Sequence, residues 1–76
     1  MTQENLLEII NSILKNKGGK KVSVIKGNMD LRNDIGLTSL DLAELTVKIE
    51  DITGIDIFED GLINTIEEIY YKLKIE

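Results

Sequence analysis

The chain has 76 residues, a net charge of −5 and neither cysteine nor histidine, which excludes disulfides, thiolate nucleophiles, the usual zinc ligands and the commonest general base. A chain of this length forms a single domain, residues 1–76, with a thin core, and because aromatic residues make up only 4% of it, that core must be built from aliphatic side chains. The acidic charge disfavours nucleic acid as a partner, since binding to phosphates depends on cationic side chains, and favours basic protein surfaces.

A first helix is predicted from Thr2 to Asn16, because apolar residues recur there at spacings of three and four. These residues are Leu6, Leu7, Ile9, Ile10, Ile13 and Leu14. Thr2 is a suitable N-cap, and Gly18 and Gly19 end the helix.

Residues 17–37 predict a long connecting loop, because glycines interrupt them and no helical period is sustained. The segment KKVSVIK, residues 20–26, alternates as a strand would, but no second strand is present to pair with it. A connection this long in so small a domain usually has a functional use.

A second helix is predicted from Ser39, since Thr38 can cap it and Asp41 completes a capping box; Thr53 and Gly54 end it. The side chains expected on its buried face are Leu42, Ala43, Leu45, Val47, Ile49 and Ile52. The side chains expected in solvent are Asp41, Glu44, Lys48, Glu50 and Asp51.

An extended link at residues 55–58 and a brief turn at residues 59–63 lead to a last helix, predicted from about Thr65 to Lys74. Its inner face is expected to consist of Ile66, Ile69, Tyr70 and Leu73. The pattern as a whole predicts an all-α domain.

The segment Asp34–Leu45, which reads DIGLTSLDLAEL, closely resembles the attachment signature of acyl carrier proteins and of the related peptidyl carrier domains. The resemblance covers essentially the whole chain, because the helices, the long loop and the Gly-Ile-x-Ile link follow the family's order. It implies an acyl-carrier-like bundle of three main helices plus one short helix, with a long loop between the first two.

The resemblance further implies that a phosphopantetheinyl transferase moves a 4′-phosphopantetheine arm from coenzyme A to Ser39. The thiol of the arm would then hold acyl intermediates of fatty-acid, polyketide or related biosynthesis as thioesters for acyl-loading and acyl-processing enzymes. The physical chemistry agrees, because a serine in the first turn of a helix is exposed and meets unpaired amides at the positive end of the helix dipole.

Three departures from the family's usual form stand out, and one of them is Lys48, which breaks an otherwise acidic face of the second helix. Thr38 replaces the aspartate that normally precedes the serine, which keeps the cap but removes a negative charge and mildly favours a specialised pathway over the housekeeping fatty-acid carrier. The region from Ile57 to Ile66 is shorter than usual, so the short helix is expected to be only a turn.

By position, the residues that match the family's docking surface for basic patches on its enzymes are Leu40, Asp41, Glu44, Glu50 and Asp51. An ordinary solvated helix face explains the same charges equally well. We expect a monomeric cytoplasmic protein without membrane insertion, because no apolar run spans a bilayer and the N-terminus lacks the features of a signal peptide.

Three alternatives remain. The chain could be an aminoacyl or peptidyl carrier, or an unmodified carrier-fold protein that acts only as an interaction module. The third alternative is a calcium-binding loop, whose pattern is nearly matched. Phe58 has no side-chain oxygen, but other positions fit: Asp56, Asp60, Gly61, Asn64 and Glu67. An enzyme is not expected, because no histidine can activate Ser39 and Lys48 lies more than two helical turns away.

Overall fold

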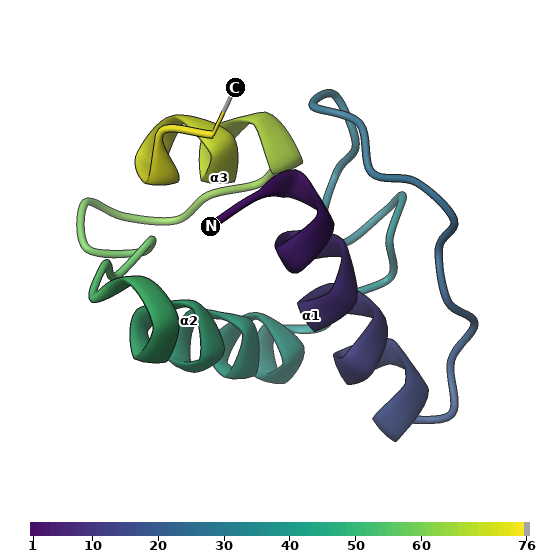
Figure 1. Cartoon of the computed structure of the whole chain (residues 1–76). Coiled ribbons are helices and arrows are strands. Elements are labelled where there is room, and N and C mark those ends of the chain that lie inside the picture. Colours follow the sequence, from purple (N-terminus) through teal and green to yellow (C-terminus); the bar gives the residue numbers. More distant parts are fainter. Residues whose placement is uncertain (76) are drawn as a thin grey trace.

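Three helices make up the regular structure of the computed structural model, which describes residues 1–75 (Figure 1). They are α1 (Gln3–Asn16), α2 (Ser39–Thr53) and α3 (Ile66–Leu73), close to the predicted boundaries. A threonine precedes each helix and forms a capping box with a residue in its first turn: Thr2 with Asn5, Thr38 with Asp41 and Thr65 with Glu68. None of these helices is long and apolar enough to cross a membrane.

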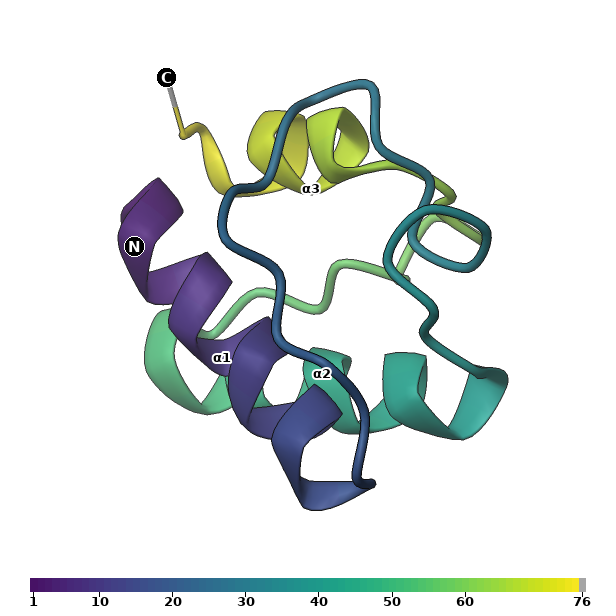
Figure 2. The same ribbon diagram turned by 90° about the vertical axis from the view of Figure 1, so that its right-hand side faces the viewer.

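The helices enclose one small core. α2 and α3 lie at opposite ends of the molecule in both views, and α1 runs along one side, from near the level of α3 to past α2 (Figure 1 and Figure 2). The buried side chains are aliphatic, as the composition predicts: Leu6, Ile10, Ile13, Leu14, Ile25, Leu31, Ile35, Leu37, Leu42, Leu45, Ile49, Ile57, Ile63, Ile66 and Ile69. The expected all-α bundle with a long loop between its first two helices is confirmed.

The long loop is a structural part of this bundle. Between α1 and α2 it passes along α3 before it returns to α2 (Figure 2). Its backbone is tied to the start of α3 by hydrogen bonds from Leu31 N–H to Asn64 O at 2.7 Å, from Ile66 N–H to Met29 O at 3.1 Å and from Glu67 N–H to Gly27 O at 2.8 Å. Among residues 1–75 no strand forms in the alternating segment 20–26, because no partner strand lies beside it.

The short helix implied by the resemblance is a turn in this chain, at residues 57–60. Glu59 N–H donates to Asp56 O and Gly61 N–H to Phe58 O, both at 3.1 Å, and the side chain of Ile57 is fully buried. The shortness of this region left room for a turn only, as the sequence predicted.

Several exposures predicted for α2 are wrong. Val47 and Ile52 are each 63% exposed and Ala43 is exposed, whereas Asp41 is only 8% exposed. At 100° per residue, Val47 and Ala43 point away from Leu45, while Asp41, one turn before Leu45, shares its inward face.

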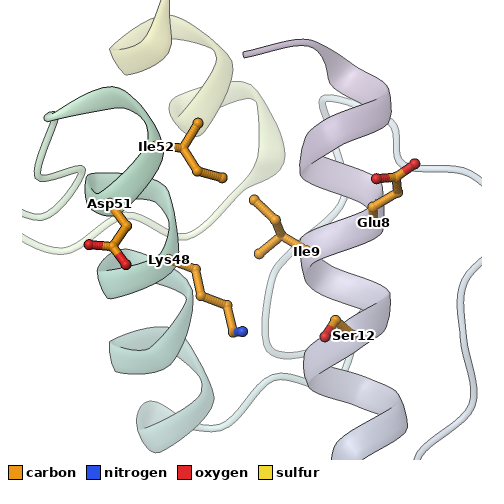
Figure 3. Close-up of a pocket in the computed structure, with 6 residues that line it drawn as sticks. All are labelled: Glu8, Ile9, Ser12, Lys48, Asp51 and Ile52. Atoms are coloured by element: carbon orange, nitrogen blue, oxygen red, sulfur yellow. The ribbon is translucent and has the colours of Figure 1, made fainter.

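The two remaining differences lie near the C-terminal end of α2. Ile52 lines an open groove beside Ile9, so most of its side chain stays exposed (Figure 3). Lys48, expected in solvent, is half-buried in the same groove.

Candidate functional site

Ser39 is the first residue of α2 and is exposed. Its Oγ accepts a hydrogen bond from Arg32 Nη2 at 3.3 Å. The first amides of a helix have no acceptor within it and form the positive end of its dipole. The hydroxyl is therefore open to a reaction partner, in surroundings that tolerate an added negative charge.

The start of α2 is fixed by its capping box. Asp41 N–H donates to Thr38 Oγ1 at 3.2 Å, and Thr38 N–H donates in return to Asp41 Oδ2 at 2.9 Å. The threonine in place of the family's usual aspartate thus retains the capping function expected of it. This box holds Ser39 at a defined point on the surface.

A lysine from the end of α1 reinforces this cap. Lys17 Nζ lies 2.6 Å from Asp41 Oδ2 and also donates to Gly36 O at 3.0 Å. The hydrogen bond from Lys17 and the one from Thr38 N–H hold the pKa of Asp41 below its usual value. Asp41 was expected among the docking residues, but the structure contradicts its exposure, because the carboxylate is used inside the fold.

Arg32 is the functional candidate that sequence reasoning missed. It lies seven positions before Ser39, in the loop, where no helical or strand period relates the two residues. The spacing therefore gave no signal, and only the folded loop brings the guanidinium to the serine.

A hollow of about 220 Å³ opens beside the serine. Its lining is mostly apolar and comes from the loop, α2 and the segment before α3: Arg32, Ser39, Leu42, Ala43, Phe58 and Leu62. Leu62 is 80% exposed at its rim. A group attached to Ser39 would therefore begin next to an apolar surface.

The outer face of α2 carries the remaining residues predicted for partner binding. Leu40 is 80% exposed directly after Ser39. Glu44, Glu50 and Asp51 are exposed. None of these four is involved in the capping box, so this face is free to meet a basic surface.

A second groove, of about 310 Å³, lies between α1 and α2 (Figure 3). Ile9 and Ile52 point toward one another across it, and Lys48 extends along it. Lys48 is nine residues after Ser39, about 13 Å along the helix. The groove is therefore separate from the serine.

The calcium-loop near-match does not gather its ligands. Within residues 1–75 no three acidic side chains form a cluster that could hold a metal ion. Asp60 pairs with Lys72, and Asp56 Oδ1 accepts the N–H of Phe58 at 2.9 Å. These carboxylates are occupied by contacts within the fold.

This chain is similar to one known protein family and to known proteins. The family model described as "Phosphopantetheine attachment site" matches residues 4–70. A protein of Saccharopolyspora erythraea named "Acyl carrier protein" is 34% identical over 62 residues, 82% of this chain and 65% of that protein. The chain thus spans slightly less than two thirds of this relative. One of Coprothermobacter proteolyticus with the same name is 30% identical over 71 residues, 91% of this chain and 87% of the relative. No solved structure gives a significant match.

Proposed function

The chain belongs to the acyl carrier protein family, whose members bear phosphopantetheine, and from this membership we propose that Ser39 is the residue to which the arm is attached. The observation that carries the proposal is an exposed serine at the first position of a capped helix, next to an arginine and an apolar hollow. The serine also occupies the position of the attachment residue in the family's signature.

The attachment is a phosphoryl transfer from coenzyme A. The Ser39 oxygen forms a bond to the phosphorus that bears pantetheine, the bond from this phosphorus to the adenosine 3′,5′-bisphosphate group breaks, and the hydroxyl proton leaves to a base. The carrier has no histidine, so we assign that base to the transferase. Once attached, the arm supplies a thiol that holds an acyl group as a thioester.

Carriers of this family present cargo rather than transform it. The fold around Ser39 fixes the point of attachment through Thr38, Asp41 and Lys17. Tethering raises the effective concentration of a cargo at each partner's active site. We therefore assign the chain no catalytic residue of its own.

The partners in this proposal are a phosphopantetheinyl transferase and acyl-loading and acyl-processing enzymes with basic docking patches. The docking face lies on α2 after Ser39 and is exposed to solvent. It consists of Leu40, Glu44, Glu50 and Asp51. Opposite charges on the two surfaces would speed the encounter. Asp41 is left out of this face, because it is buried.

The setting we propose is a single carrier domain over residues 1–76, in the cytoplasm. Its cargo would be an acyl intermediate of fatty-acid, polyketide or related biosynthesis. Thr38, in the place of the family's aspartate, is the feature that favours a specialised product.

The test is intact mass spectrometry after incubation with coenzyme A and a promiscuous phosphopantetheinyl transferase. The wild-type protein should gain the mass of one arm, and Ser39→Ala should gain none. The chain's other serines, Ser12 and Ser23, provide a matched control, and the double variant Ser12→Ala/Ser23→Ala should be modified like wild type. An unchanged wild-type mass with several transferases would instead favour the interaction module.

A further inference from the structure

We propose that Arg32 is a positioning residue that binds the phosphodiester of the arm once it is attached to Ser39. This inference rests on the function proposed above and names a contact within that same site. It starts from the hydrogen bond that Arg32 Nη2 donates to Ser39 Oγ at 3.3 Å. In the modified protein, the phosphorus is bonded to this same oxygen. Its two free oxygens are two bonds from Ser39 Oγ, and the guanidinium beside Oγ can reach them.

The turn that carries Arg32 is held in place by two carboxylates. Asp30 Oδ2 accepts the N–H groups of Arg32 at 3.0 Å and Asn33 at 2.7 Å, while Asp34 Oδ2 accepts the N–H of Asp30 at 2.7 Å. Leu31 is fully buried. The backbone of Arg32 is thus fixed from both sides, and its side chain projects from a defined point toward Ser39.

Among the described residues, the guanidinium of Arg32 forms no ion pair. Within residues 1–75 the two ion pairs are Lys17 with Asp41 and Lys72 with Asp60. Asp30 and Asp34, the acids nearest to Arg32 in the sequence, direct carboxylate oxygens at backbone N–H groups instead. Arg32 is the chain's only arginine, so this planar double donor, suited to a phosphate, stands beside the serine that would carry one.

The local charge also favours this contact. The protein carries a net charge of −5, and a phosphodiester adds one more negative charge at Ser39. Thr38 is neutral where the family's usual residue is an aspartate, and Arg32 adds a positive charge on the neighbouring turn. Both features make the surroundings of the phosphodiester less negative, and a bound phosphodiester would restrict the base of the arm.

The test is ³¹P NMR of the full-length modified protein. The chemical shift of the phosphodiester in the folded state is compared with that in urea, where no specific contact survives. Arg32→Gln should lose most of the folded-state shift difference, and Arg32→Lys, which keeps the charge without the planar fork, should recover only part of it. Lys26→Gln is the matched control, since it removes one positive charge from the same loop beside Gly27, which bonds to α3; it should keep the wild-type difference.

A second readout uses the single arginine. In ¹⁵N-labelled wild-type protein, its guanidinium N–H resonance should shift on modification and exchange more slowly with water. Circular dichroism of the unmodified variants shows that they are folded, as expected for an exposed side chain. A wild-type protein that gains no arm overturns the proposed function and this inference together. A modified protein in which Arg32→Gln keeps the wild-type phosphorus shift overturns this inference alone.

Discussion

The carboxylate of Asp41 makes two contacts that hold the start of α2. It pairs with Lys17, the C-cap residue of α1, and accepts the N–H of Thr38. Because both contacts favour the charged form, the pKa of Asp41 is lowered by folding. The carboxylate therefore stabilises the fold above its ordinary pKa of 3.8, and this contribution is lost as the pH falls through the lowered value.

Asp41→Asn is expected to lower the free energy of unfolding at neutral pH by about 1 kcal/mol, because the amide keeps little of the interaction with Lys17. The loss stays near this value since Lys17 is 34% exposed and water screens the pair. Urea unfolding at a series of pH values measures the free energy of unfolding of wild type and variant. The difference between wild type and variant should shrink as the pH falls below 3.8.

Glu44→Gln is the matched control on the same helix, since Glu44 is exposed, and it should change the free energy of unfolding by less than about 0.5 kcal/mol. Equal losses for the two variants at all pH values would show that the pairing with Lys17 does not stabilise the fold.

For single residues, the sequence predicts those contacts that join near neighbours in the chain. Thr38 and Asp41 are three positions apart, so their capping box was predictable from helix geometry. The contacts of Lys17 with Asp41 and of Arg32 with Ser39 depend on how the loop closes, which no local spacing encodes. Local spacing therefore predicts neither the burial of Asp41 nor the contact of Arg32 with Ser39.

The element that concentrates the proposed function is α2. Its first residue is the proposed attachment site, and its outer face carries exposed acidic and apolar side chains. The helix boundaries were predictable because Thr38 and Gly54 are strong start and stop signals, and Gly54 adopts the left-handed conformation at φ 75°. The buried stripe was only partly predictable, since burial near the end of α2 depends on where α1 leaves a groove.

Glu44→Lys tests the docking role of this face. It is expected to raise the KM of a phosphopantetheinyl transferase for the carrier by about fivefold, equivalent to about 1 kcal/mol, with kcat unchanged. Steady-state kinetics at several salt concentrations measure the effect, which should decrease as salt screens the charges. The reversed charge would act on the encounter, not on the chemistry at Ser39.

Glu8→Lys makes the same charge change on α1, where Glu8 is exposed and lines the groove between α1 and α2, not the hollow beside Ser39. It should raise KM much less. Similar effects of the two variants would mean that net charge alone, and not the α2 face, directs the transferase.

At the scale of the whole molecule, the long loop packs against the helices and completes the core. It contributes Ile25, Leu31, Ile35 and Leu37 to the core. The same segment carries Arg32 and Gly36, which contact Ser39 and Lys17. Its length was evident from the sequence, but its path along α3 arises from long-range backbone hydrogen bonds.

Leu31→Ala is expected to cost about 3 kcal/mol in the free energy of unfolding, because it empties a fully buried position. Ile35→Val provides a milder change of about 1 kcal/mol, should the first variant be too unstable to measure. Val24→Ala, at a position 55% exposed in the same loop, should cost far less. Urea unfolding compares them, and a loss for Leu31→Ala no greater than that for Val24→Ala would contradict a structural role for the loop.

The attachment of the arm to Ser39 is tested most directly on protein purified from its native cells, by proteolysis and mass spectrometry of the peptides. The peptide that contains Ser39 should carry the mass of a phosphopantetheine arm, with or without an acyl group, and the peptides that contain Ser12 and Ser23 should be unmodified. An arm on either of those serines, or a Ser39 peptide that is never modified, would contradict the account.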